Sequence, residues 1–88
     1  MGPYEIVLVR QAARDLADLP RNVRRRLERA LEGLSENPFR SRPGCDIRWL
    51  HGAPGRRSLR VGHYRAIFEV HGKTVRVLAC AHRSVVYR

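Results

Sequence analysis

The sequence has few lysines, cysteines and acidic residues, and each scarcity narrows the class of protein. The 88 residues include one lysine, two cysteines and eight acids, and no apolar run is long enough to span a bilayer, which excludes an integral membrane protein. No basic segment followed by an apolar stretch begins the chain, so we expect no secretory signal and a cytoplasmic location. Two cysteines are too few for a disulfide scaffold and favour reduced thiols. Neither has the spacing of a metal site, so no cofactor is expected.

Arginine supplies almost all of the positive charge. Seventeen arginines and Lys73 give a net charge of +10 on a chain long enough for a single domain over residues 1–88. Residues 1–36 carry a net charge of +1, whereas residues 37–88 carry +9. The second half has too few acids to neutralise its own arginines, so we expect this half to meet a polyanion.

Hydrophobic periodicity predicts two helices near the start of the chain and strands on either side of them. Apolar residues recur at helical spacing in two stretches, and Pro20 separates these stretches as the first residue of the second helix. Alternation with period two begins at Arg56, and Gly62-His63 suits a tight hairpin turn. The expected elements are a strand at 4–9, helices at 10–19 and 20–36, and strands at 56–61, 64–71 and 74–81.

The order of these elements, β-α-α-β-β-β, defines the fold class. It predicts an α+β domain with a mostly antiparallel sheet and an N-terminal αα-hairpin packed on one face. Residues 38–55 are rich in proline and glycine and are expected to form a loop. Its apolar residues would anchor the loop to the core, because a lone tryptophan packs in a core more often than it forms a functional platform. These anchors are Phe39, Ile47, Trp49 and Leu50.

Strand alternation also predicts a basic face on the sheet. Arg56, Ser58 and Arg60 share one side of their strand, and Leu59 and Val61 lie on the other. Equal parity places Arg76 and His82 together on the last strand. The residues that can join the basic face from later strands and the tail are Arg65, Arg76, His82, Arg83 and Tyr87.

Such a face contains the groups that RNA cleavage requires. Guanidiniums bind phosphate oxygens and stabilise the extra charge of a phosphorane-like transition state. The substrate's own 2′-hydroxyl can be the nucleophile, so His82 and Tyr87 are candidates for the two proton transfers. No paired carboxylates accompany them, which argues against a metal-dependent nuclease. A plainer alternative stays open, in which the arginines only bind phosphate and His82 is structural, so periodicity alone predicts a basic domain that contacts nucleic acid.

Five motifs occur in order over nearly the whole chain. The most specific is Leu59-Arg60-Val61-Gly62-His63-Tyr64-Arg65, and the C-terminal string His82-Arg83-x-x-x-Tyr87 supports it. The other three are Tyr4-x-Ile6-Val7, Ala13-Arg14-Asp15-Leu16-x-x-Leu19-Pro20 and Leu34-x-x-x-Pro38. Together these motifs resemble the RelE/ParE toxin superfamily of bacterial type II toxin–antitoxin systems.

The resemblance implies a microbial-ribonuclease-like fold and a ribosome-dependent, metal-independent mRNA endonuclease that cuts in the ribosomal A site. The implied partners are a cognate antitoxin that neutralises the toxin, the ribosome and mRNA, with operator DNA bound only through the antitoxin. The catalytic residues matched by position are Arg65, Arg83, His82 and Tyr87. The residues expected to bind RNA beside them are Arg56, Arg57, Arg60 and Arg76.

Two positions depart from the pattern of the superfamily. His63 stands where an acid or asparagine is usual, and Ser58 stands where the most active members carry lysine. The ParE branch has the same fold, lacks the ribonuclease residues and inhibits DNA gyrase, and a non-catalytic basic module that binds RNA or protein is a further alternative. The presence of Arg65, Arg83 and Tyr87 favours the ribonuclease.

Overall fold

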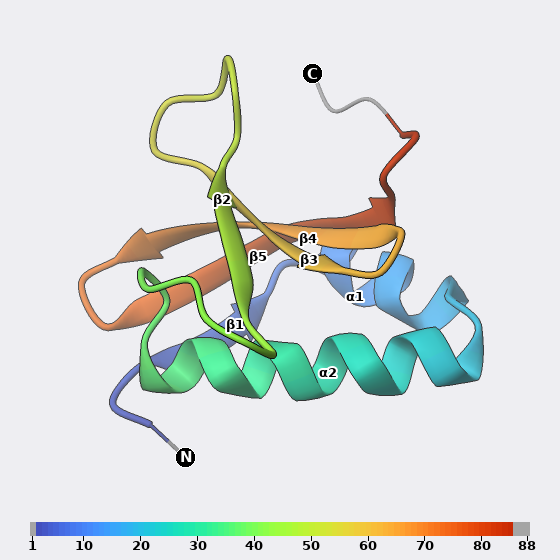
Figure 1. The fold of residues 1–88 in the computed structure, drawn as a ribbon, viewed down its shortest axis with the longest axis horizontal. Coiled ribbons are helices and arrows are strands. Elements are labelled where there is room, and N and C mark those ends of the chain that lie inside the picture. The colour runs from blue at the N-terminus through green and yellow to red at the C-terminus, as the bar shows by residue number, and fades with distance from the viewer. Residues whose placement is uncertain (1, 86–88) are drawn as a thin grey trace.

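Two helices and five strands make up the part of the chain that the structure describes. This structure is a computed structural model, and it describes residues 2–85. In chain order the elements are β1 (Glu5–Leu8), α1 (Arg10–Asp18), α2 (Arg21–Glu36), β2 (Asp46–Trp49), β3 (Arg57–Val61), β4 (Tyr64–His71) and β5 (Thr74–His82) (Figure 1). None of the helices in residues 2–85 is long and apolar enough to cross a membrane.

The two helices form because each carries one apolar stripe, as the sequence predicted. Ala12 and Leu16 are the buried residues of α1. The longer stripe of α2 comprises Val23, Leu27, Ala30, Leu31 and Leu34, with Ser35 buried at its end. Pro20 lies at the N-terminal boundary of α2, where its missing N–H costs no helical hydrogen bond. The predicted αα-hairpin is therefore confirmed, with a two-residue link.

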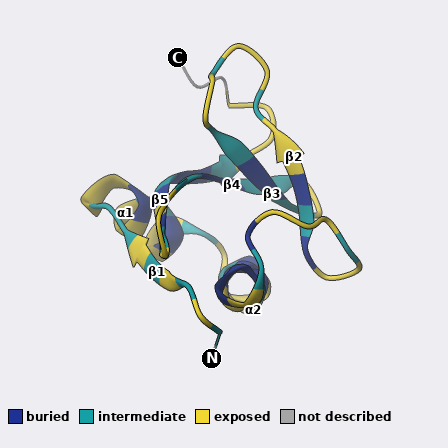
Figure 2. Ribbon diagram, turned by 90° about the vertical axis from the view of Figure 1, so that its left-hand side faces the viewer, coloured by how far each residue is buried: buried dark blue, intermediate teal, exposed yellow. Residues whose placement is uncertain are grey.

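The strands form one sheet in the order β1-β5-β4-β3-β2. Only β1 is parallel to its neighbour, β5, and the other three pairs are antiparallel. Side chains of α1 and α2 share a single core cluster with sheet residues such as Leu59, Phe68 and Val77. Both helices therefore cover the same face, and the sheet curves over α2 in the view down that helix (Figure 2). The predicted α+β class and the one-sided packing are confirmed.

One strand was missed by the sequence prediction, because β2 lies inside the segment expected to be a loop. It pairs with β3 through the register Asp46–Arg60 to Trp49–Arg57 and forms one edge of the sheet. Ile47 is its one buried residue, so a strand of four residues gives almost no alternation to detect. The expected anchoring of the loop is also wrong for two aromatic side chains, since Phe39 is 49% exposed and Trp49 is 67% exposed.

Tight turns join the strands of the β3–β4–β5 meander. The turn between β3 and β4 is Gly62-His63, as predicted, and Gly62 has a φ of +59°, which only glycine adopts without strain. A side chain there would also meet the guanidinium of Arg26, whose Nη2 lies 3.4 Å from the position of a Cβ. This turn determines where β4 begins, and Arg65 is the second residue of that strand.

Candidate nucleic-acid interface

A groove lined by arginines lies on the side of the sheet opposite the helices. Its volume is about 590 Å³. The loop between β2 and β3 and the chain after β5 both rise from the side of the sheet opposite α2 (Figure 1), and residues of both line the groove. The residues that line it include Arg48, Arg56, Arg60, Arg65 and Arg83. None of the described residues that line this arginine groove is acidic.

The floor of the arginine groove places like charges side by side. Arg60 on β3 and Arg65 on β4 are direct cross-strand partners. Like charges directly opposite one another destabilise a sheet, so this pair lowers stability unless an anion lies between the two side chains. Ser58, which is 4% exposed, also lines the groove, and its short side chain leaves room between the longer arginines. The arrangement is that of a site for a polyanion.

Arg65 holds the chain that follows β5. Its Nη2 donates hydrogen bonds to the carbonyl oxygens of Arg83 at 3.1 Å and Val85 at 3.2 Å. The backbone N–H of Arg83 also donates to the carbonyl of His63, at 2.6 Å. These contacts bring Arg83 into the groove beside Arg65, as the sequence predicted for this pair. Arg65 is therefore both a charge in the groove and a brace for its neighbour.

A β-bulge separates two residues that parity had placed together. Tyr64 pairs with His82 and Glu69 pairs with Arg76, although Tyr64 and Glu69 lie on opposite faces of β4. The register shifts between Ile67 and Phe68, so β5 contains one extra residue, Leu78. Because a bulge reverses the alternation beyond it, Arg76 and His82 lie on opposite faces, and the expectation of a shared face is wrong.

His82 lies next to the arginine groove rather than in its lining. Its ring packs edge-on against Tyr64, with centroids 5.2 Å apart, and Tyr64 lines the groove. Nδ1 of His82 lies 2.8 Å from the hydroxyl oxygen of Ser84 and accepts a hydrogen bond from the backbone N–H of Ser84 at 3.2 Å, and these two contacts fix the ring. Tyr87, the other residue predicted for proton transfer, lies outside the described residues.

The remaining predicted RNA-binding arginines divide between the groove and other contacts. Arg56 and Arg60 line the arginine groove. Arg57 instead contacts two aromatic rings, and its Cζ lies 4.0 Å from the ring centroid of Trp49 and 4.9 Å from that of Phe39. Sequence reasoning had not included Arg48, Trp49 and His51 in the site, although all three line the groove. They belong to β2 and the loop after it, where the sequence shows no periodicity.

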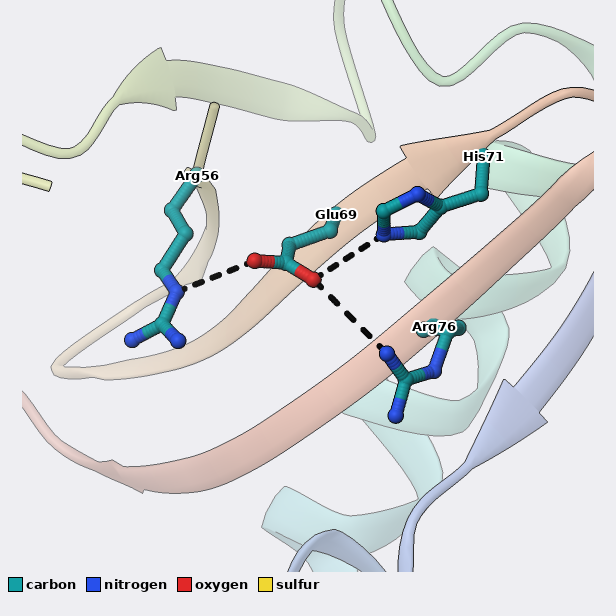
Figure 3. A network of polar contacts seen from close by, with 4 residues as sticks. All are labelled: Arg56, Glu69, His71 and Arg76. Atoms are coloured by element: carbon teal, nitrogen blue, oxygen red, sulfur yellow. Dashed lines mark hydrogen bonds and ion pairs between the residues drawn. The ribbon is translucent and has the colours of Figure 1, made fainter. Parts of the chain in front are cut away.

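One carboxylate contacts three basic side chains, one of which belongs to a residue that lines the arginine groove. Oε2 of Glu69 accepts a hydrogen bond from Nε of Arg56 at 3.2 Å, and Oε1 lies 3.0 Å from Nε2 of His71. Arg76 Nη1 is 3.9 Å from the same Oε1 (Figure 3). The hydrogen bonds from His71 and Arg56 hold the pKa of Glu69 below its ordinary value. Glu69 therefore restrains Arg56, one of the arginines of the groove.

We expect a Glu69→Gln variant to be less stable than the wild type at neutral pH but not at acidic pH. A lowered pKa means that ionised Glu69 stabilises the fold above its unfolded pKa of 4.5, and this contribution disappears as pH falls through the folded value. The free energy of unfolding of the wild type should exceed that of the variant by no more than about 1 kcal/mol at pH 7, since the network is partly exposed. Urea unfolding at pH 7 and pH 3 measures the difference, and an equal difference at both values would contradict the assignment.

Both cysteines are buried thiols. Burial raises the pKa of Cys80 to about 12, with a further contribution from the charge of Asp15, whose Oδ2 accepts a hydrogen bond from the Cys80 backbone N–H at 3.0 Å. Burial also raises the pKa of Cys45, and the nearby Arg42 partly offsets this effect. Both sulfurs are free thiols, as the sequence predicted. Among residues 2–85 no three His, Cys, Asp or Glu side chains gather as metal ligands.

Native Cys80 is expected to react with iodoacetamide about 10³-fold more slowly at pH 8 than in the unfolded chain. The thiolate is the reactive form, and a pKa about three units above the ordinary value of 9.0 reduces its population by that factor. Timed alkylation followed by mass spectrometry of the peptide measures the rate, and labelling in urea is the control. Equal rates in the two states would show that the sulfur is accessible.

Comparisons with known proteins identify the family to which this chain belongs. Residues 6–87 match the family model described as the ParE toxin of type II toxin–antitoxin system, parDE. The chain belongs to this family and is a toxin of the RelE/ParE superfamily. No curated protein sequence matches it.

Solved structures of toxin–antitoxin systems have the same fold. The toxin–antitoxin complex RelBE2 from Mycobacterium tuberculosis contains a chain that is 27% identical, with a TM-score of 0.77 and coverage of 92% of this chain and 99% of that one. The archaeal RelE–RelB complex from Pyrococcus horikoshii OT3 gives 25% identity, a TM-score of 0.77 and coverage of 96% and 99%. A chromosomal ParDE system from P. aeruginosa gives 21% identity, a TM-score of 0.67 and coverage of 91% and 96%. At this level of identity, the match shows similarity of fold alone.

Proposed function

We propose that this toxin is a ribosome-dependent endoribonuclease that cuts mRNA in the ribosomal A site and so inhibits translation. The observation that carries the proposal is the arginine groove, which is lined by five arginines and by no described acid. A phosphodiester is the substrate that such a groove would attract and orient. The RelE complexes, which are 25–27% identical to this chain, add support from the superfamily.

The chemistry needs no metal, because the substrate provides its own nucleophile. The 2′-oxygen attacks the adjacent phosphorus and the bond to the 5′-oxygen breaks, leaving a 2′,3′-cyclic phosphate and a 5′-hydroxyl. One proton leaves the 2′-hydroxyl and another reaches the departing 5′-oxygen. Arg65 and Arg83 would stabilise the charge on the non-bridging oxygens, since a guanidinium donates two parallel hydrogen bonds to such a pair.

The proton transfers and the binding of the flanking chain fall to other side chains. His82, behind Tyr64, and Tyr87 are the proposed acid and base, as their place in the C-terminal motif implies. Arg56 and Arg60 would bind neighbouring phosphates from the groove. Arg57 and Arg76 lie outside its lining and would contact RNA only beyond the reacting group.

A cognate antitoxin is the proposed regulator. The solved relatives are toxin–antitoxin complexes. A groove with this charge would be covered by an extended acidic or amphipathic segment, which neutralises the arginines and excludes RNA. Operator DNA would then be contacted through the antitoxin, and the ribosome and mRNA would be the partners of the free toxin.

A second candidate is inhibition of DNA gyrase. The observation in its favour is the family model itself, which is that of the ParE toxin. The ParDE fold match is consistent with this candidate, and a polyanion-binding groove does not by itself distinguish RNA from a DNA–protein complex.

One induction experiment separates these functions. The toxin is induced without antitoxin, and mRNA 5′ ends, DNA breaks and growth are followed together. An endoribonuclease should leave cuts in phase with the reading frame before DNA is damaged. Double-strand breaks with intact mRNA would assign the chain to gyrase, and normal growth would indicate a non-catalytic binding module.

A further inference from the structure

The guanidinium of Arg56 lies on the open face of the sheet, where it contacts Glu69. Phe68, which precedes Glu69 in β4, is completely buried in the core that the helices cover. Because neighbouring residues of a strand alternate, the side chain of Glu69 lies on the other face, which it shares with Arg65. Nε of Arg56 donates to Oε2 of Glu69 at 3.2 Å. Arg56 is therefore an arginine of the groove lining whose charged end is placed on the open face by a printed contact.

The contact with Glu69 uses only part of the donor capacity of Arg56. A guanidinium has five N–H donors, and within residues 2–85 the Nε–H is the only one that makes a hydrogen bond. The Arg56 side chain is 43% exposed, and Nη1 and Nη2 point away from Glu69 in Figure 3. The edge formed by these two nitrogens can donate two parallel hydrogen bonds to two oxygens of one phosphate. This edge of the guanidinium is therefore available to a ligand.

Glu69 is itself restrained through its other oxygen. Oε1 lies 3.0 Å from Nε2 of His71 and 3.9 Å from Nη1 of Arg76 (Figure 3). Arg76 is the direct cross-strand partner of Glu69, and His71 lies two residues further along β4 on the same face. The Glu69 side chain is 22% exposed and is the most sheltered of the four in this network. A carboxylate contacted at both oxygens gives Arg56 a fixed anchor.

We propose that Glu69 is a positioning residue for RNA, which holds Arg56 so that the unused edge of the guanidinium binds a backbone phosphate of the strand in the arginine groove. This proposal rests on the proposed function in so far as RNA is the ligand of the groove. Glu69 lies four residues from Arg65 along β4, a distance of about 13 Å, so the phosphate on Arg56 flanks the reacting one. An arginine that is already ordered loses less rotamer freedom when it binds, which strengthens binding.

The negative charge of Glu69 acts on RNA in the opposite direction. Removal of a carboxylate about 8 Å from a phosphate would by itself strengthen binding about twofold in water, and salt would reduce this effect. Return of full rotamer freedom to an arginine would weaken binding by up to about 30-fold. Because the two effects have opposite signs, the direction of the change in affinity distinguishes a positioning residue from a merely repulsive charge.

Binding of RNA to the full chain tests the proposal. The probe is a short, labelled 2′-O-methyl RNA oligonucleotide, which 2′-hydroxyl attack cannot cleave, and fluorescence anisotropy gives its affinity. Glu69→Gln should weaken binding by about 3- to 10-fold, although the variant carries one negative charge fewer. The matched control Glu32→Gln removes the same charge from an exposed position on α2, on the other side of the sheet, and should leave affinity within about twofold. Circular dichroism confirms that each variant is folded.

A double-mutant cycle shows whether Glu69 acts through Arg56. In an Arg56→Ala background the carboxylate has no arginine to hold, so Glu69→Gln should strengthen RNA binding by about twofold instead of weakening it. This reversal of sign is not expected of a residue that only stabilises the fold. In cleavage of mRNA on ribosomes, Glu69→Gln should raise KM more than it lowers kcat, since the phosphate on Arg56 is not the reacting one.

Several outcomes would overturn the positioning role. Unchanged or tighter RNA binding in folded Glu69→Gln would make Glu69 a neutral or repulsive charge. Equal weakening with and without Arg56 would mean that Glu69 acts by another route. Absence of binding to the wild type would overturn both this proposal and the proposed RNA ligand. If the cycle gives the expected reversal while induced toxin leaves mRNA intact, the positioning role stands and the nuclease proposal fails.

Discussion

An Arg65→Ala variant of this toxin is expected to cleave mRNA about 10²–10³-fold more slowly and to permit growth when induced alone. That factor is typical of the loss of one preorganised donor to a developing negative charge. Here the substitution has two consequences, since the guanidinium also donates to the carbonyls of Arg83 and Val85. Loss of these bonds would weaken the hold on Arg83, whose backbone N–H would still donate to the carbonyl of His63. Primer extension on mRNA from induced cells measures the cleavage.

Controls distinguish the charge of Arg65 from its bracing role. Arg65→Lys keeps the charge but not the planar fork, so it should recover RNA binding more fully than cleavage. Arg21→Ala removes a guanidinium from α2, away from the groove, and should leave cleavage unchanged. Circular dichroism must show that each variant is folded. Full toxicity in folded Arg65→Ala would remove this residue from the proposed active site.

A Phe68→Ala variant is expected to lose about 3–5 kcal/mol of stability, which is a large part of the total of about 5–15 kcal/mol for a small domain. Phe68 is completely buried and belongs to the core cluster between the helices and the sheet. Alanine would leave a cavity that the surrounding helices and strands can fill only in part. Urea unfolding followed by circular dichroism at 222 nm measures the change, and the melting temperature should fall by more than about 10 °C.

The matched control for Phe68 is an apolar residue on the surface. Val7, in the edge strand β1, is 38% exposed, so Val7→Ala should cost much less. A loss below about 1 kcal/mol in Phe68→Ala would mean that the core around β4 adapts to the smaller side chain. Such a result would contradict the close packing between the helices and the sheet.

The sequence predicted those parts of the fold whose residues repeat with a clear period. The stripe of α2 and the alternation of β3 and β4 are long enough to define a face, so the helices, the meander and the side that Arg60 and Arg65 occupy were all predicted. The short strand β2 contains one buried residue and has no such repeat. Arg48 and Trp49 were therefore missed as parts of the groove, because their position depends on pairing with β3 rather than on their own sequence.

The site was harder to predict beyond the middle of β5. Parity counts residues along one strand, whereas the face on which a side chain lies depends on the register with the neighbouring strand. A single extra residue at Leu78 therefore separated Arg76 from His82, and nothing in the residues around Leu78 indicates a bulge. Arg83 was nevertheless placed correctly, since it follows the strand and is held by Arg65.

Leu78 also determines how this chain should be aligned with its relatives. The pairs on either side of it, Ile67 with Ala79 and Phe68 with Val77, remain adjacent whether or not a residue is inserted between Val77 and Ala79. A gap is therefore structurally inexpensive at position 78 and costly elsewhere in β5. An alignment that places the gap a few residues away would compare Arg76 or His82 with side chains of the opposite face, and residue roles would then be transferred to the wrong positions.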